Sequence, residues 1–150
     1  MKPFFFAALL LLAVLFAGCS PAAPSPVAGV TPDLPTPIAL EAGKGGLSGQ
    51  VAEAASRWSG ETVTAFAAPF TAVNGQEQGF YVLEPEVHPH TNLDASGRFQ
   101  MGSVDPGTYV LVVGPSAREG ALVMNGDGKP RVFTVKSGEL LQTGPLTLAQ

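Results

Sequence analysis

Apolar and polar positions along the long C-terminal part of the chain follow the pattern of short strands separated by turns. Glycine, proline, asparagine or aspartate breaks the apolar runs about every ten residues, the spacing typical of an all-β sandwich. Residues 62–67 alternate with period two, which places Val63, Ala65 and Ala67 on one face of a strand. Residues 109–113 do not alternate, which predicts a central strand that is apolar on both faces. Strands are predicted at 47–51, 62–67, 79–83, 98–101, 108–113, 122–124, 131–135 and 146–148.

The breaks between these runs have the composition of particular turns. Asp105-Pro106-Gly107-Thr108 predicts a type II turn, in which proline fixes φ at about −60° and the glycine takes a positive φ. The hydroxyl of Tyr109 is then placed to reach a loop carbonyl, the arrangement called a tyrosine corner. Residues 94–97 and 125–128 are predicted to be hairpin or loop tips. Residues 52–59 could form one helical turn, which is too short to be stable alone.

The N-terminal residues have the pattern of an export signal. Residues 4–18 lack polar side chains and would span about 22 Å as a helix, less than the bilayer core of about 30 Å, so we expect a cleaved signal peptide. Leu15-Phe16-Ala17-Gly18-Cys19 resembles the lipobox of bacterial lipoproteins, which the lipoprotein signal peptidase cuts before the cysteine. The resemblance implies acylation of Cys19, and two or three acyl chains give stable anchoring. A plain secretory signal with an unmodified Cys19 and an uncleaved anchor are the alternatives.

Residues 20–44 form a separate segment that contains six prolines and no aromatic residue. Such a segment cannot offset its ordering entropy by burial, and it favours an extended tether of at most about 80 Å. The predicted organisation is a signal peptide at 1–18, a lipidated cysteine and linker at 19–44, and one domain at 45–150. A docking strip for a polyproline-binding partner is the alternative role for the linker.

Composition and charge narrow the classes of partner. The 150 residues include 8 Lys and Arg against 12 Asp and Glu, a net charge of −4, so the chain lacks the positive field of a nucleic-acid-binding protein. A single cysteine excludes an internal disulfide and a cysteine-based zinc site. We therefore expect no nucleic acid partner and no cofactor.

Several segments of the predicted domain carry a resemblance to a known superfamily. The hairpin DASGRF at 94–99 precedes the Pro-Gly-x-Tyr turn and strand at 104–113, with GLSGQV at 46–51 before them and VFTV at 132–135 after them. In this order they resemble the carboxypeptidase regulatory-like, or transthyretin-like, β-sandwich superfamily over residues 45–149. The sequence departs from that pattern between Trp58 and Phe80. The resemblance implies a single antiparallel sandwich of about seven or eight strands that is noncatalytic.

Two histidines form the one candidate metal site of the sequence. His88 and His90 would face the same side of an extended strand and could reach one metal, with Glu84 or Glu86 as a third ligand. Pro89 between them is typical of an edge or loop, where surface histidine is common. We expect unliganded histidines and keep metal binding as the alternative.

Other catalytic or covalent sites find little support in the sequence. Residues 125–128 lack the further carboxylates of a calcium loop, and no Gly-x-Ser-x-Gly elbow is present. Residues 148–150 differ from the Tyr-Arg-Gly-Ser tail of the transthyretin-like hydrolases of a purine catabolite. Lys44 lacks a partner for an isopeptide bond in the last strand, apart from Gln150. We therefore expect a protein that is not an enzyme.

Aromatic residues are the remaining candidates for ligand binding. Trp58, Phe66, Phe70, Phe80 and Tyr81 could together form a platform on which sugars stack. Because aromatics total only 8% of the chain and several must fill the core, we expect them to be buried or partly buried. A ligand platform is the alternative.

These patterns together predict a lipid-anchored extracytoplasmic protein on the cell membrane or outer membrane. Its β-sandwich would be a noncatalytic structural or protein-binding module, with the bilayer as partner through acylated Cys19 and an envelope protein or glycan as the second partner. The alternatives are a carbohydrate-binding module at the cell surface and an envelope metal-binding protein.

Overall fold

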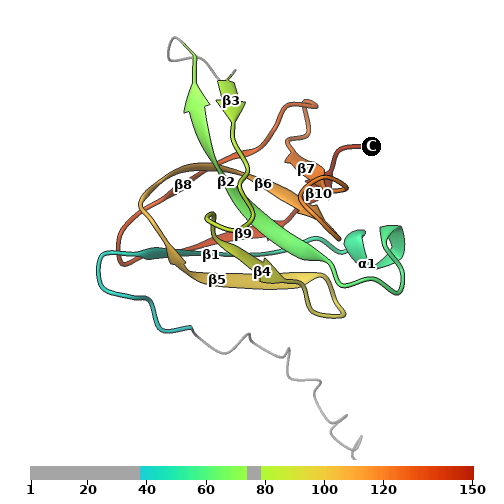
Figure 1. Cartoon of the computed structure of the whole chain (residues 1–150), viewed down its shortest axis with the longest axis horizontal. Coiled ribbons are helices and arrows are strands. Elements are labelled where there is room, and N and C mark those ends of the chain that lie inside the picture. Colours follow the sequence, from blue (N-terminus) through green and yellow to red (C-terminus); the bar gives the residue numbers. More distant parts are fainter. Residues whose placement is uncertain (1–37, 74–78) are drawn as a thin grey trace, which may run out of the picture. The chain divides into compact units, whose positions relative to one another are not determined.

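The computed structural model describes residues 38–73 and 79–150, which form strands with one short helix (Figure 1). This confirms the predicted all-β class. The elements are β1 (Gly45–Gln50), α1 (Ala54–Arg57), β2 (Thr64–Ala72), β3 (Gly79–Tyr81), β4 (His90–Asn92), β5 (Arg98–Val104), β6 (Gly107–Gly114), β7 (Ala121–Met124), β8 (Val132–Val135), β9 (Leu140–Pro145) and β10 (Thr147–Leu148).

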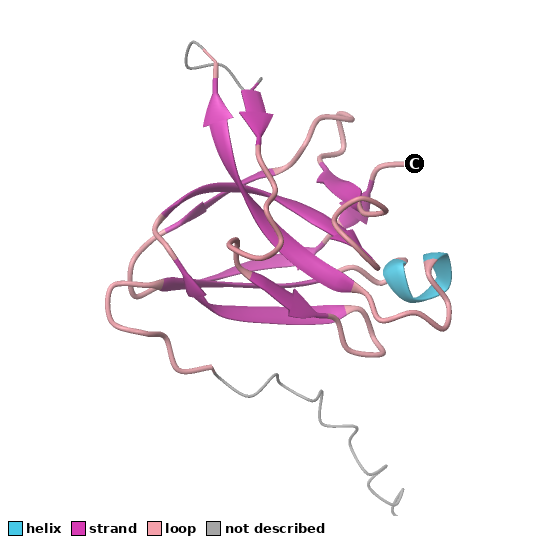
Figure 2. Ribbon diagram, viewed as in Figure 1, coloured by secondary structure: helices cyan, strands magenta, loops and turns pink. Residues whose placement is uncertain are grey.

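These strands form two sheets (Figure 2). The smaller sheet has the order β5-β1-β9, in which β9 runs parallel to β1. The larger sheet has the order β10-β7-β6-β2-β3, with β4 added to β2 and β8 added to β6, and all its pairs are antiparallel. Buried side chains from both sheets form one hydrophobic cluster, which makes the arrangement a sandwich.

Strand β6 is buried on both faces, as its unbroken apolar sequence predicts. Tyr109, Leu111 and Val113 belong to the cluster between the sheets. Val110 and Val112 point to the opposite face and are buried as well. The predicted shared face of β2 is also confirmed, since Ala65 and Ala67 enter the same cluster together with Val63 just before the strand. The opposite face, with Thr64, Phe66 and Ala68, is buried as well.

The tyrosine corner is confirmed, whereas the predicted type II turn is wrong. The Tyr109 hydroxyl donates a hydrogen bond to the carbonyl oxygen of Asp105 at 2.9 Å. Burial, with a contribution from the Asp105 charge, raises the pKa of Tyr109, so this hydroxyl keeps its proton. Gly107 does not take a positive φ, because it already pairs with Val135 of β8 and its backbone is extended as the first residue of β6.

Two strands and several boundaries differ from the prediction. β4 is polar and only three residues long, and it forms because it pairs with β2 and its Asn92 Oδ1 accepts from the Thr64 hydroxyl at 2.9 Å. β9 contains Gly144 and Pro145, which are typical of a loop, yet it pairs with β1 as an edge strand. β2 continues to Ala72 instead of ending at 67, and β3 ends at Tyr81 instead of 83.

Residues 38–44, which the sequence places in the linker, contact the sandwich. The Glu41 carboxylate accepts from the Ser103 hydroxyl at 2.8 Å, and the Lys44 ammonium lies 2.6 Å from Asp105 Oδ1. The backbone carbonyl of Lys44 also accepts from the Gly138 amide at 2.8 Å. The end of the linker is therefore attached along the start of β1.

We predict that Tyr109→Phe lowers the free energy of unfolding by about 1 kcal/mol, because the ring stays in the core and only the hydrogen bond to Asp105 is lost. The melting temperature should fall by about 4 to 8 °C. Urea and thermal denaturation of both forms measure the difference. Tyr81→Phe, which removes an exposed hydroxyl, is the matched control. Equal stability of Tyr109→Phe and Tyr81→Phe would contradict the role of the corner.

Candidate functional site

The predicted lipidation site lies outside the described residues. Cys19, the signal peptide and the linker as far as residue 37 all fall in this part of the chain. Lipidation of Cys19 therefore stays a prediction. Within 38–73 and 79–150, no helix is long and apolar enough to cross a membrane.

Each of the two histidines uses its Nδ1 atom in a contact with the backbone. His88 Nδ1 accepts from the Glu84 amide at 3.0 Å, and His90 Nδ1 lies 3.0 Å from the His88 carbonyl oxygen. The His90 ring also contacts the Phe66 ring, with 5.8 Å between the centroids. Among the described residues, no group of three or more His, Cys, Asp or Glu could hold a metal ion. The Nδ1 atoms of both histidines thus contact the backbone of the segment between β3 and β4.

The hairpin at 125–128 has the predicted turn geometry. Gly128 takes a φ of 78°, and the Asn125 amide donates to the Lys129 carbonyl at 2.7 Å. Asp127 Oδ1 accepts from the Lys129 amide at 3.2 Å. The Asp127 carboxylate, the charged oxygen ligand that a calcium loop would use here, therefore stabilises the turn itself.

The turn at 94–97, which connects β4 of the larger sheet to β5 of the smaller sheet, is held by one carboxylate oxygen. Asp94 Oδ1 accepts from the Ser96 amide at 2.8 Å, the Ser96 hydroxyl at 2.7 Å and the Arg98 amide at 2.8 Å. Gly97 has a φ of 76°, which favours glycine at this position. Partial burial raises the pKa of Asp94, but the hydrogen bonds from Arg98 and Ser96 outweigh it and lower the pKa below its usual 3.8.

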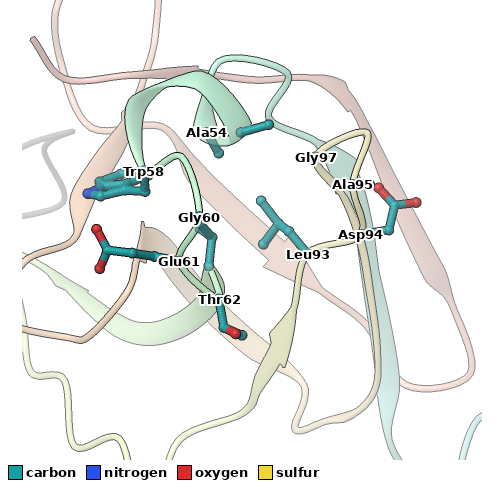
Figure 3. A pocket seen from close by; sticks show the side chains of 11 residues that line it. Ala54, Trp58, Gly60, Glu61, Thr62, Leu93, Asp94, Ala95 and Gly97 are labelled. Carbon is teal, nitrogen blue, oxygen red and sulfur yellow. The ribbon is translucent and has the colours of Figure 1, made fainter.

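A cavity of about 320 Å³ lies between α1 and the turn at 94–97 (Figure 3). Trp58 lines it and packs against the core, and the Arg57 guanidinium stacks over the Trp58 ring at 5.1 Å from its centroid. Arg57 also donates to the Ala149 carbonyl at 2.6 Å, which ties α1 to the C-terminal strand. Figure 3 shows Glu61 beside Trp58, with Asp94 on the other side of the cavity. Trp58 therefore attaches α1 to the sandwich, and Arg57 covers one of its faces.

The five candidate aromatic residues do not share one surface. Phe66 is buried, and Trp58 lies next to α1. Phe70 lies near the end of β2 and Phe80 and Tyr81 lie in β3; Figure 1 shows β2 starting near α1 and this end of β2, with β3, projecting away from it. A common platform of all five rings is therefore not formed.

A projecting pair of strands carries the three remaining aromatics. β2 pairs with β6 only as far as Pro69, opposite Tyr109. Beyond this point β2 pairs with β3 alone, from Phe70 opposite Tyr81 to Ala72 opposite Gly79. Figure 1 shows these strand ends rising away from the rest of the sheet. We call residues 70–73 and 79–82 the β2–β3 ribbon.

The ribbon and the segment after it form an exposed apolar surface. The side chains of Phe80 and Val82 are 57% and 52% exposed, and Val73, Tyr81 and Val87 are exposed as well. Within the described part of the chain, the one other exposed large hydrophobic side chain is Val132, at 37%. The outer edge of β3 pairs with no other described strand. The ribbon thus offers both apolar side chains and open backbone hydrogen-bonding groups.

The sequence groups Phe70, Phe80 and Tyr81 with Trp58 and Phe66 and does not predict the ribbon. A usable signal was the run of four apolar residues at 80–83 beside Glu84 and Glu86, because such a run is out of place on an exposed strand.

No family model and no curated protein matches the chain.

We predict that Asp94→Ala lowers the free energy of unfolding at pH 7 by about 1 to 2 kcal/mol, since three hydrogen bonds to one carboxylate oxygen are lost. Because the folded pKa of Asp94 is lowered, this stabilisation is complete above the usual pKa of 3.8 and is lost as the pH falls through the folded value.

The measurement is urea denaturation of wild type and Asp94→Ala between pH 7 and pH 2. Asp127→Ala is the matched control, because Asp127 lies at another hairpin tip and accepts one backbone amide. The stability gap between wild type and Asp94→Ala should be constant down to about pH 4 and then shrink. A gap that is absent at pH 7, or that widens in acid, would contradict this role of Asp94.

Proposed function

We propose that this chain is a lipid-anchored extracytoplasmic protein whose sandwich, of the carboxypeptidase regulatory-like type, is a noncatalytic protein-binding module. The observation that carries the proposal is the β2–β3 ribbon, which combines exposed apolar side chains with an open strand edge. Contiguous exposed apolar surface on a small domain is typical of an interaction site. Open strand edges are common sites for the binding of an extended chain.

The contacts of the candidate reactive groups support a noncatalytic role. Both histidine Nδ1 atoms contact the backbone, and the Asp94 oxygen is occupied by its own turn. Lys44 is paired with Asp105, and this hydrogen bond raises the pKa of Lys44, which favours the charged ammonium over the neutral nucleophile. No nucleophile with an adjacent base is evident among these groups.

The lipobox and the proline-rich linker support anchoring at a membrane surface. Acylation of Cys19 would confine the sandwich to within the length of residues 20–37 from the bilayer, at most about 60 Å. Confinement of this kind raises the effective concentration of a binding module toward partners in the same envelope. A weak contact at the ribbon would then suffice for function.

The positions of the ribbon aromatics favour a protein partner over a glycan. Phe70 and Tyr81 are cross-strand partners and lie on one face of the ribbon, whereas Phe80 is opposite Thr71 and lies on the other face. A sugar-stacking platform needs several rings on one face. Rings on both faces of a strand pair suit a partner chain that covers its edge.

We predict that Cys19→Ser moves the protein from the detergent phase to the aqueous phase in Triton X-114 partitioning of membranes from expressing cells. The reason is that the serine hydroxyl cannot form the thioether that would hold the acyl chains. Ser20→Ala, a change at the neighbouring position, is the matched control and should partition like wild type. Equal partitioning of Cys19→Ser and wild type would refute lipid anchoring at this residue.

A further inference from the structure

The charge of the sequence stretch that contains the ribbon is of one sign. Between Arg57 and Arg98 the chain contains no Lys or Arg, whereas it contains Glu61, Glu77, Glu84, Glu86 and Asp94. The whole chain has a net charge of −4, so this stretch accounts for the acidity of the protein. The ribbon therefore lies within an acidic part of the sequence.

Two of these carboxylates lie directly after the ribbon. Glu84 and Glu86 follow β3 within five residues of Tyr81, and both are exposed. No ion pair between described residues involves either side chain. Their charges are thus available to a partner that lies along β3 and continues past its end.

The open edge of β3 determines the conformation of such a partner. β3 pairs with β2 on one side and with no described strand on the other. An extended peptide that adds to this edge would form backbone hydrogen bonds, and its side chains would alternate between the two faces of the ribbon. On one face they would meet Tyr81, and on the other Phe80.

We propose that the open edge of β3 binds an extended, basic segment of another protein. Its backbone pairs with β3, its apolar side chains pack on Phe80 and Tyr81, and its Lys or Arg side chains lie opposite Glu84 and Glu86. Cations also interact favourably with the faces of exposed aromatic rings. This inference rests on the proposed protein-binding role and names the chemistry of the partner.

Charge disfavours three other occupants of the open edge of β3. A second copy of the chain that paired through its own β3 would bring the same acidic residues against Glu84 and Glu86, and like charges disfavour that pairing. An anionic bilayer surface would repel them for the same reason. Residues 20–44 of the linker contain Asp33, Glu41 and one basic residue, Lys44, which is already paired with Asp105, so this chain's own tether lacks a basic extended segment.

The test uses the full-length lipidated chain in nanodiscs of zwitterionic lipid and fluorescence anisotropy with three labelled peptides of equal length. The first alternates Val and Lys, the second alternates Val and Glu, and the third is the Val/Lys peptide with alternate backbone amides methylated. We expect the Val/Lys peptide to bind at least about tenfold more tightly than the other two, because only it has both the charge and the backbone donors. Added salt should weaken its binding.

Two variants separate the apolar and the charged parts of the site. Phe80→Ser should weaken binding of the Val/Lys peptide about tenfold, whereas Val132→Ser, which changes an exposed valine away from the ribbon, should bind like wild type. Glu84→Gln/Glu86→Gln should lower affinity about fivefold and reduce the salt dependence. All of these positions are exposed, so thermal melts should show unchanged folding in every variant.

The proposal is overturned if the Val/Glu or methylated peptide binds as tightly as the Val/Lys peptide, if Phe80→Ser has no effect, or if no peptide binds. Self-association of the chain that Phe80→Ser abolishes would assign the edge to a second copy. Binding of the non-lipidated Cys19→Ser chain to protein-free vesicles through Phe80 would assign it to the bilayer. None of these results bears on lipid anchoring, which the Triton X-114 partitioning of Cys19→Ser tests. The two proposals therefore fail separately.

Discussion

The point at which β6 stops pairing with β2 determines where the exposed part of β2 starts. β6 is paired with β2 along one edge and with β7 and β8 along the other, and both of its faces are buried. Its first residue, Gly107, follows Pro106, which has no amide to donate. The hydrogen bond from Tyr109 to Asp105 holds the turn at this point. β6 pairs with β2 no further than Pro69, opposite Tyr109, whereas Gly107 and Thr108 of β6 pair with β8 alone.

The β2–β3 ribbon is a direct consequence of this limit. β2 continues to Ala72 without its β6 neighbour and is accompanied by β3 alone. A two-stranded hairpin is marginally stable by itself in water, so a protein that keeps one here gains little folding stability from it. Exposed Phe80, Tyr81 and Val82 also add aggregation risk. A partner that covers the ribbon in the cell envelope would offset both its low stability and its aggregation risk.

Features that depend on local sequence were predicted well. Three features depend on residues close to one another in the chain, and all three are confirmed. They are the two-sided burial of β6, the hydrogen bond of the Tyr109 hydroxyl and the turn at Asp94. β4 and β9 were missed because they form only by pairing with distant strands, and their own sequences favour loops. Pairing with β8 likewise overrode the turn preference of Gly107.

The candidate site was harder to predict for the same reason. The sequence shows that Phe70, Phe80 and Tyr81 are aromatic, but their exposure depends on where β6 stops pairing with β2, which is a property of the assembled sheet. The acidic stretch between Arg57 and Arg98 is visible in the sequence, yet its meaning depends on the open β3 edge beside it. Trp58, the most distinctive aromatic, is instead used to attach α1.

Site-specific photocrosslinking in intact cells tests most directly whether the ribbon is the interaction surface of a tethered module. A benzophenone amino acid would replace Phe80 in one variant and Val132, the exposed valine outside the ribbon, in another. The account predicts an adduct at position 80 with a segment of another envelope protein that carries Lys or Arg, and none at position 132. Adducts at position 80 only with lipid or with a second copy of the chain, or equal adducts at both positions, would contradict it.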